Sequence, residues 1–408
     1  MMKKGGKRAP EVRFKGFIDD WEQRRLGNNT EILTGGTPKT SVLEYWEPKE
    51  IPWMSSGEVN KRRLDSTDNM ISKKGLDNSS AQWVKEYSVL IALAGQGKTR
   101  GTVAINRIPL TTNQSIAAIV LDETLHYEFI FQNLLKRYEE LRMISSGDGT
   151  RGGLNKQLVS DIIIDCPNIE EQKTIGTFFA DLDHHIALLQ RKIDMLKQLK
   201  QGFLQQMFPQ NGENVPRLRF ANFKGEWEQR KLKDFVEVYV EKTTIQNQYP
   251  VLTSSQKYGI IYQEEYFADR QVTTENNIGY YVIPKGYFTF RSRSDNGVFK
   301  FNRNDLIDKG IVSYFYPVFG ISNGNSNFFL YMLNSAIKKQ VAIEAEGTGQ
   351  RVLSLNKFKN INIMIPVIQE QTRIGNSFKQ IDNTLDLLLS KLDKLQSLKK
   401  TYLQKMFI

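Results

Sequence analysis

The sequence is poor in the residues that most catalytic and metal sites use. Its 408 residues include one cysteine, Cys166, and three histidines, His126, His184 and His185. A single cysteine excludes an intramolecular disulfide and any multi-cysteine zinc site, and it fits a reducing compartment. We expect the histidines to pack on the surface or beside a helix seam. The chain is therefore not expected to be an enzyme on its own.

Several sequence motifs are also missing. No two prolines are adjacent, so the N-P-P-[FY] and D-P-P-Y motifs of adenine methylation are absent. No apolar run approaches the ~20 residues that a membrane-spanning helix needs. The basic start, MMKKGGKRAP, has no apolar segment behind it, unlike a signal peptide. We expect a soluble, cytoplasmic protein with no membrane contact.

Basic side chains outnumber acidic ones, 56 to 45, for a formal charge of +11. An excess of this kind suits a polyanion such as double-stranded DNA. Its distribution is uneven, because residues 1–170 carry 24 basic and 22 acidic side chains, net +2, whereas residues 217–369 carry 20 and 14, net +6. The first part would need local clustering or partner subunits to hold DNA.

The chain is an internal repeat, which bears on every later inference. The segment VRFKGFIDDWEQRRL (12–26) returns as LRFANFKGEWEQRKL (218–232), with eight of fifteen positions identical. Residues 166–208 return as 365–407, with 19 of 43 positions identical. The sequence therefore predicts a tandem duplication in which each copy is a variable globular half followed by a more similar tail.

Both tails carry apolar residues at alternating steps of four and three, which is typical of a coiled-coil helix. The stripe covers about five heptads, and one slot in each copy is a lysine, Lys200 or Lys399. One amphipathic helix on a globular core would explain only part of it. The predicted seam consists of Ile175, Phe179, Leu182, Ile186, Leu189, Ile193, Leu196, Ile374, Phe378, Ile381, Leu385, Leu388, Leu392 and Leu395.

Ahead of each tail, short β-rich runs are broken by turn residues and followed by one helix, so each half is predicted to be α+β. The runs are 87–93, 101–105 and 115–121 with a helix near 126–142, and 287–292, 297–301 and 311–319 with a helix near 326–343.

The connection between the copies predicts the arrangement. About eight residues link the first helix to the second copy and span under ~30 Å, whereas a 35-residue helix is ~50 Å long. The second helix can then pair with the first only by running antiparallel. We expect two globular domains separated by two long antiparallel helices, with pseudo-two-fold symmetry. Duplex DNA has local two-fold symmetry and half-sites ~34–36 Å apart, which this spacing could match.

The stretch LIALAGQGKTRGTVAIN (90–106) resembles a phosphate-binding P-loop only in part. Gly97, Lys98 and Thr99 fit its end, but Ala92 stands where the first glycine belongs. A β-branched run follows where a P-loop needs a helix. The second copy has YFTFRSRSDNGVFKF at the same place, with Gly297 opposite Gly101. We predict a hairpin loop in both copies rather than an ATP site.

Polar and basic residues of such loops suit DNA, because arginine and lysine bind phosphates and guanine edges while asparagine and glutamine bind adenine. Solvated loops and a plain helix-to-strand connection are the competing interpretations. The candidate DNA contacts, taken from three pairs of corresponding loops, are Ser55, Ser56, Lys61, Gln96, Lys98, Thr99, Arg100, Arg151, Ser254, Ser255, Lys257, Tyr258, Arg291, Arg293, Asp295, Asn296, Gln350 and Arg351.

These features together resemble the specificity subunit of type I restriction-modification systems, over nearly the whole chain. The resemblance lies in the openings VRFKGFIDDWEQRRLG and LRFANFKGEWEQRKL, in TGGTPKTSVLEYWEPKEIPWMSSGEV, and in the paired P-x-x-x-E-Q-x-x-I-G helix starts. It implies two target-recognition domains, each reading one part of a bipartite, asymmetric DNA site. It also implies that the helices set the gap between the parts and dock the partners.

The same resemblance implies the partners and their cofactors. Two modification subunits would bind S-adenosylmethionine and methylate adenine, and two restriction subunits would use ATP and Mg. This chain itself would bind no cofactor and no metal. The expected organisation is a basic arm (1–11), a first recognition domain (12–168), a spacer helix (169–208), a linker (209–216), a second recognition domain (217–366) and a C-terminal spacer helix (367–408).

Two alternatives remain at this stage. A free-standing DNA-binding protein with two modules would share the repeat but have no enzyme partner. A nucleotide hydrolase would use the 95–101 loop and depend on Lys98.

Overall fold

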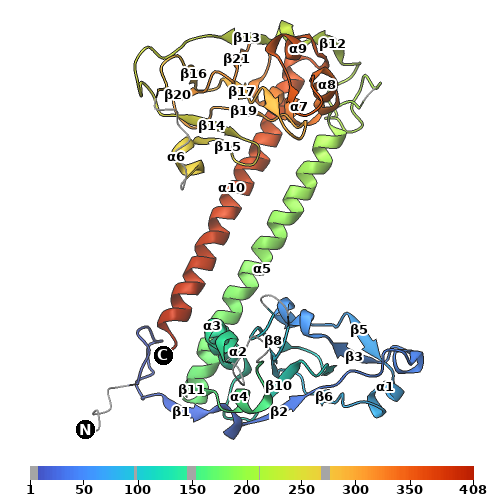
Figure 1. Cartoon of the computed structure of the whole chain (residues 1–408), viewed down its shortest axis with the longest axis vertical. Helices are drawn as coiled ribbons and strands as arrows, with labels where there is room; N and C mark the ends of the chain where they lie inside the picture. Colours follow the sequence, from blue (N-terminus) through green and yellow to red (C-terminus); the bar gives the residue numbers. More distant parts are fainter. Residues whose placement is uncertain (1–7, 96–98, 145–152, 211, 268–275) are drawn as a thin grey trace. The chain divides into compact units, whose positions relative to one another are not determined.

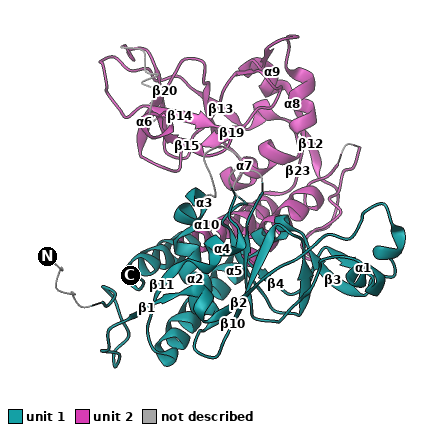
Figure 2. Ribbon diagram, turned by 60° about the horizontal axis from the view of Figure 1, so that its bottom comes forward, with its two compact units in different colours: residues 1–190, 391–408 teal, residues 191–390 magenta. Residues whose placement is uncertain are grey.

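The computed structural model describes residues 8–95, 99–144, 153–210, 212–267 and 276–408. The chain divides into two compact units, residues 1–190 with 391–408 and residues 191–390 (Figure 2). Each unit contains one mixed α/β domain and a part of each of two long helices, so the units are described one at a time.

The first unit holds three sheets, of five, four and two strands (Figure 1). Short 3₁₀ helices lie at Leu26–Asn28, Leu43–Tyr45 and Ser56–Lys61. The remaining elements are β1 (Glu22–Arg25), β2 (Thr30–Thr34), β3 (Ile51–Met54), β4 (Arg63–Leu64), β5 (Asn69–Ile71), β6 (Trp83–Val84), β7 (Val89–Ala92), β8 (Val103–Asn106), β9 (Leu110–Thr112), β10 (Ile116–Leu121), β11 (Ile163–Cys166), α1 (Lys73–Asp77), α2 (Tyr127–Lys136), α3 (Tyr138–Met143), α4 (Lys156–Ser160) and the start of α5 (Ile169–Gln206).

The central sheet of this unit has the strand order β2-β10-β7-β8-β4. Its middle strands are apolar except at Asn106 because both of their faces are buried, and successive side chains point to opposite faces. Val89 and Ile91 of β7 face one cluster with α2 and α5, whereas Leu90 and Ala92 face another with Met54. The sheet therefore fixes where the β7–β8 loop leaves the domain.

The second unit has smaller sheets, and its largest has the order β13-β21-β17-β19. A 3₁₀ helix lies at Leu232–Asp234. The other elements are β12 (Glu228–Lys231), β13 (Val236–Tyr239), β14 (Leu252–Ser255), β15 (Gly259–Tyr262), β16 (Tyr281–Pro284), β17 (Phe288–Phe290), β18 (Arg293–Ser294), β19 (Phe301–Arg303), β20 (Lys309–Val312), β21 (Val318–Ile321), β22 (Arg351–Val352), β23 (Asn362–Ile365), α6 (Gln263–Tyr266), α7 (Ser326–Ser335), α8 (Lys338–Glu344), α9 (Leu355–Asn360) and α10 (Ile368–Lys405).

The expected α+β duplication with two long helices is confirmed, and two local expectations need correction. Each single helix predicted before the tails is two short helices, since the chain leaves helical geometry at Arg137 (φ −88°, ψ 16°) and around Ile337. The run 311–319 forms two strands rather than one. The reason is that β20 pairs with β16 whereas β21 pairs with β13 and β17, so the chain changes sheets between them.

The repeated Arg-Phe and Glu-Gln motifs join the opening of each copy to the start of its own helix. Arg13 donates to both carboxylate oxygens of Glu171 at 2.6 and 2.7 Å, and Arg219 does the same to Glu370 at 2.7 Å twice. Both glutamates are fully buried. Such bidentate pairs are strong, and losing one partner would leave a buried charge unpaired.

In each domain, the glutamine after this glutamate and the glycine four residues further on hold a short helix, α2 or α7, against the long helix. Gln172 Oε1 accepts the backbone N–H of His126 at 3.0 Å, and Gln371 Oε1 accepts that of Asn325 at 3.0 Å. A Cβ on Gly176 would come within 2.8 Å of the Glu128 Cβ. The repeated Gln and Gly therefore allow α2 and α7 to lie directly against the long helices.

The end of each long helix enters the core of the other copy's domain. In the first unit, the Phe407 ring lies 5.1 Å from Phe129, 5.8 Å from Phe179 and 6.4 Å from Trp21. In the second unit, the equivalent Phe208 lies 5.5 Å from Phe328 and 6.2 Å from both Phe378 and Trp227. Within each unit the start of one helix thus packs on the end of the other, and the two run antiparallel.

The predicted seam side chains are all buried or half-buried. The two lysines that interrupt the apolar stripe also have partners. Lys399 pairs with Asp183 in the first unit, and Lys200 pairs with Asp382 in the second. The two interruptions of the apolar stripe are therefore equivalent ion pairs between the helices.

Truncating an exchanged ring should destabilise the domain that receives it. We expect Phe407→Ala and Phe208→Ala each to lower the free energy of unfolding by ~3–5 kcal/mol, because a buried phenyl group leaves a cavity. Ile408→Ala, at a half-exposed neighbour, is the control and should cost far less. Urea unfolding of the full chain measures this. An equal loss for Phe407→Ala and Ile408→Ala would contradict the exchange.

The single cysteine lies in the core of the first unit. Cys166 is 1% exposed and pairs with Glu22 across β1 and β11. Burial raises the pKa of its thiol to about 12. The thiol is therefore neutral at physiological pH and has the character of a packing group.

A raised thiol pKa makes stability depend on pH in one direction. The folded state keeps the thiol protonated, so its contribution is complete below the ordinary pKa of ~8.5 and falls as the pH rises toward 12. We expect the stability difference between the wild type and Cys166→Ala to shrink between pH 8 and pH 10.5 in urea unfolding. A difference that stays constant over that range would show that the thiol pKa is not raised.

Candidate nucleic-acid interface

The glycine-rich stretch of the first domain is a β-hairpin. β7 pairs antiparallel with β8, and Gly101 N donates to Ala92 O at 2.9 Å. Gly101 has φ 78°, in the left-handed region that favours glycine. Because a strand follows the loop, no helix N-terminus is available to hold a phosphate. The hairpin prediction is confirmed and the P-loop alternative is wrong.

Two of the candidate residues of this hairpin are described, and both are half-buried. Arg100 Nη2 donates to the carbonyl oxygen of Arg142 at 2.7 Å, which holds the hairpin against the end of α3. Thr99 O accepts from Thr102 N at 3.0 Å within the turn. The candidates Gln96, Lys98 and Arg151 lie outside the described residues.

The serine-rich loop of the first domain is used largely for local structure. Ser55 caps the 3₁₀ helix Ser56–Lys61, and its N–H donates to Glu58 Oε1 at 2.9 Å. Lys61 pairs with Glu58 at 3.0 Å and with Asp68 at 2.7 Å. The hydrogen bond to Asp68, above all, raises the pKa of Lys61. Ser55 and Lys61 therefore have internal partners, and Ser56 is half-buried beside them.

The loops before α4 and α9 return to the hairpins at equivalent positions. Leu154 N donates to Leu93 O at 3.1 Å in the first domain, and Leu353 N donates to Ser292 O at 2.9 Å in the second. The structure thus brings the second and third candidate loops of each copy to the same edge of its domain.

The β14–β15 hairpin of the second domain also uses its serines internally. Ser254 Oγ accepts from Asn302 Nδ2 at 2.8 Å, and Ser255 Oγ accepts the backbone N–H groups of Lys257 and Tyr258, both at 3.2 Å. Lys257 and Tyr258 remain exposed at the tip, where the ammonium lies 4.7 Å from the ring centre. The exposed tip is therefore the part of the hairpin that reaches furthest into solvent.

The remaining candidates of the second domain meet across a short strand pair. β18 pairs with β22, so that Ser294 lies opposite Arg351. Gln350 Nε2 donates to Asp295 Oδ1 at 2.8 Å. Asn296 Oδ1 accepts from Val298 N at 3.0 Å, and Arg351 Nη1 donates to Ala345 O at 3.0 Å. These contacts order the loop before any ligand arrives.

A cleft of about 510 Å³ lies between the β14–β15 hairpin and the loop that follows β17. A second hollow of about 350 Å³ adjoins it and reaches Gln350. Both are lined by Arg291 and Arg293, and the Arg293 guanidinium lies 4.8 Å from the centre of the Phe315 ring. Aromatic side chains from two separate segments complete the walls, namely Tyr266, Phe267, Phe315 and Tyr316.

The cations of this cleft lack acidic partners. Within the described ranges, no carboxylate lies within 4.0 Å of the charged nitrogens of Lys257, Arg291, Arg293 or Lys300. Burial lowers the pKa of Lys300, and the charges of Lys338 and Lys200 lower it further. The cleft is therefore electropositive, with aromatic walls, and is suited to an anion that carries planar groups.

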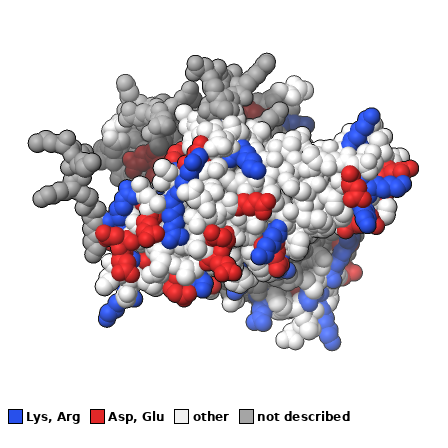
Figure 3. Space-filling view, turned by 90° about the horizontal axis from the view of Figure 1, so that it is seen from below, with Lys and Arg blue, Asp and Glu red and all other residues white. Residues whose placement is uncertain are grey.

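The first domain differs, because two of its described basic side chains beside the hairpin, Arg63 and Arg107, are paired with carboxylates. Arg63 pairs with Glu128 and Asp183, and Arg107 pairs with Asp65 at 3.3 Å. On the face drawn in Figure 3, basic and acidic side chains are interspersed and form no field of one sign. This agrees with the near balance of charge in residues 1–170.

Sequence reasoning missed Lys300 and the aromatic walls of the cleft. The signal that could have indicated them is the pair of aromatic clusters around Tyr266 and Tyr316, the first of which stands in a polar surrounding. In the part of the chain that the structure describes, no group of three His, Cys, Asp or Glu side chains could hold a metal ion. None of the described helices is long and apolar enough to span a bilayer.

Comparison with known proteins identifies the class of this fold and site. The type I restriction modification DNA specificity domain matches twice, over residues 18–198 and 224–397, and the chain belongs to this family. The repeat found in the sequence is thus two copies of one DNA specificity domain.

Particular relatives are similar over most of the chain. It is 21% identical over 398 residues to the type I restriction enzyme MjaVIII specificity subunit of Methanocaldococcus jannaschii, which covers 94% of this chain and 91% of that protein. It is 26% identical to the EcoR124I/EcoR124II specificity subunit of Escherichia coli over 38% of this chain and 39% of that one. The type I S subunit structure from M. genitalium shares the fold, with a TM-score of 0.64 and 14% identity over 98% of this chain and 99% of that one.

Proposed function

We propose that this chain is the specificity subunit of a type I restriction-modification complex, in which each domain reads one part of a bipartite, asymmetric DNA site. The proposal rests on one backbone contact that recurs in both domains. Leu154 is hydrogen-bonded to Leu93 in the first domain, and Leu353 is hydrogen-bonded to Ser292 at the equivalent edge of the second. In each copy the described end of the loop before α4 or α9 meets the strand that leads into the hairpin, and both copies belong to a family of DNA specificity domains.

In the second domain the DNA contacts are the cleft and its rim. Phosphates bind the unpaired Arg291, Arg293, Lys257 and Lys300, since phosphate contacts position a protein on DNA. The Gln350 amide reads a base edge, and the aromatic walls hold sugar or base faces. Arg293 is already held over Phe315, so less of its freedom is lost on binding.

In the first domain the contacts come from the β7–β8 hairpin and the loop before α4. Thr99 and Arg100 lie at that edge, and we extend the proposal to Gln96, Lys98 and Arg151. Since Arg63 and Arg107 are paired with carboxylates and the charge of residues 1–170 is nearly balanced, this domain supplies base selection more than charge. The whole complex, rather than this chain alone, would then bind DNA tightly.

The long helices dock the partner subunits. α5 exposes Leu188, Met195 and Leu199, whose spacing of seven and four places them on one face of the helix, and α10 exposes Leu387 and Leu398. Exposed leucines in a row are typical of a surface that another protein covers. Two modification subunits with S-adenosylmethionine and two restriction subunits with ATP and Mg would complete the complex. This chain, which acts in the cytoplasm, would hold none of those cofactors.

Removing charge from the cleft should change the salt dependence of DNA binding. We expect Arg291→Gln with Arg293→Gln to reduce the slope of log K against log salt by ~0.9 for each lost phosphate contact. Titration of target DNA at several salt concentrations, with modification subunits present, measures it. Lys285→Gln removes an exposed charge outside the cleft and should leave the slope unchanged. An unaltered slope in the cleft variant would remove the cleft from the interface.

The recognition role should appear in a methylome. Expressed with its modification subunits in a host without other methyltransferases, the chain should direct methylation of a motif with two short specific parts around a fixed gap. Replacing residues 1–168 by the domain of a relative should change one part alone. If the subunits co-purify in soluble form and no methylation is found, the free-standing DNA-binding protein becomes the better account.

A further inference from the structure

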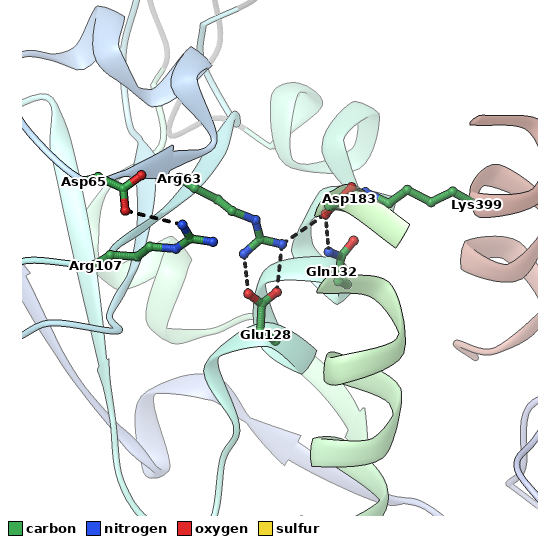
Figure 4. Close-up of polar contacts among 7 residues, drawn as sticks. All are labelled: Arg63, Asp65, Arg107, Glu128, Gln132, Asp183 and Lys399. Atoms are coloured by element: carbon green, nitrogen blue, oxygen red, sulfur yellow. Dashed lines mark hydrogen bonds and ion pairs between the residues drawn. The ribbon is translucent and has the colours of Figure 1, made fainter. Parts of the chain in front are cut away.

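In the first unit, one carboxylate joins both long helices to the recognition domain. Asp183 lies on α5, and its Oδ1 accepts from Lys399 of α10 at 2.5 Å. Its Oδ2 accepts from Arg63 at 3.0 Å and from Gln132 of α2 at 2.9 Å. Figure 4 shows these side chains converging on Asp183 from three separate parts of the fold.

The domain side of this junction is itself fixed by a buried pair. Arg63 also donates through both terminal nitrogens to the carboxylate of Glu128, which is 5% exposed. The Arg63 guanidinium lies 5.1 Å from the centre of the Phe131 ring. Burial, above all, raises the pKa of Glu128, although Arg63 opposes this. The Arg63 guanidinium thus donates to two carboxylates, those of Glu128 and Asp183, and has one defined position.

Arg63 connects Asp183 to the segments that are proposed to contact DNA. It stands two residues after the 3₁₀ helix Ser56–Lys61. Its strand β4 pairs in parallel with β8, and Arg63 lies opposite Ile105. β8 is the strand that returns from the hairpin. A shift at Asp183 would therefore move both segments together.

The second unit has the same helix-to-helix pair, but its carboxylate is joined to the domain by a tyrosine in place of an arginine. Asp382, the equivalent of Asp183, pairs with Lys200 of α5 and accepts from the Tyr331 hydroxyl at 2.7 Å. Tyr331 stands at the position of Gln132. Across the described residues, no arginine forms an ion pair with Asp382. The guanidinium link is thus a feature of the first copy.

Asp183 adds an attachment further along α5 than the contacts near the start of that helix. Glu171, Gln172 and the Phe179 ring hold the first domain near that start, and Asp183 lies eleven residues or ~16 Å beyond Gln172. Without Asp183 the domain would be held nearer the start of α5 and could tilt. A tilt of about 10° moves a loop ~20 Å from the pivot by ~3.4 Å, which is the rise of one base pair.

We propose that Asp183 is a positioning residue that sets the gap which the complex accepts between the two parts of its DNA site. The inference rests on the proposed function of the chain. Asp183 contacts no DNA in this account. It acts by holding Arg63, and through Arg63 the hairpin, at one angle to the helix pair.

The test is methylation of a series of targets in which the gap is shortened or lengthened by one base pair. Asp183→Asn keeps the shape and removes the charge. We expect methylation of the altered gaps, relative to the preferred gap, to rise about tenfold, the factor that loss of one charge-assisted hydrogen bond of ~1.4 kcal/mol gives. The bases preferred in each part should not change. Asp181→Asn, an exposed carboxylate on the same helix, is the matched control and should keep the wild-type profile.

A gap profile of Asp183→Asn identical to that of Asp181→Asn would overturn the proposal, whatever the total activity. The equivalent Asp382→Asn should loosen the gap less, since it breaks no arginine link. Arg63→Gln combined with Glu128→Gln leaves no buried unpaired charge and should reproduce the loosened profile. If the wild type also methylates none of the targets, that result counts against the proposed function and not against the role of Asp183.

Hydrogen exchange of the chain alone tests the role of Asp183 separately from the proposed function. In Asp183→Asn we expect faster exchange in α2 and in residues 391–405 together, because both are tied through this carboxylate. Asp181→Asn should leave both segments protected. Faster exchange confined to α5 would show that Asp183 does not tie α2 and α10 together. This measurement needs neither DNA nor partner subunits.

Discussion

The structure depends on the exchange of helix ends between the two copies. Phe407, from the second copy, lies among Trp21, Phe129 and Phe179 of the first, and Phe208 occupies the equivalent place in the second unit. Neither aromatic core is complete without the other copy's tail. Rings of this size contribute much of the apolar area that a small domain buries, and a missing ring would leave a costly cavity. The exchange also requires the two helices in each unit to run in opposite directions.

Charge is used in two distinct ways around that framework. The charges that hold the fold are paired and buried or half-buried, as in Arg13 with Glu171 and Lys399 with Asp183. Those around the second-domain cleft have no carboxylate partner among the described residues. Since a paired charge loses its partner when it binds a phosphate, the unpaired set is better placed to meet DNA. The two domains therefore share a fold and differ in how much charge they can offer to a ligand.

Patterns that depend on neighbouring residues were predictable. The seam from Ile175 to Leu395 follows from helical periodicity, and the hairpin at Gly101 follows from the β-branched run after it. The cleft was not predictable, because Lys300, Tyr266 and Tyr316 reach it from separate segments. The serines show the opposite case. Ser55, Ser254 and Ser255 have the right chemistry for DNA, yet their hydroxyl or backbone groups are bonded within the fold.

The sequence by itself determined the duplication, the two long helices and the family, since all three are written in local identity and periodicity. It also marked Lys200 and Lys399 as breaks in an apolar stripe. Only the tertiary structure decided what those lysines do, because Asp183 and Asp382 lie more than 180 residues away from them along the chain. The same holds for the cleft and for the link through Arg63. An ion pair or a cavity depends on which distant side chains meet, and that is settled by packing.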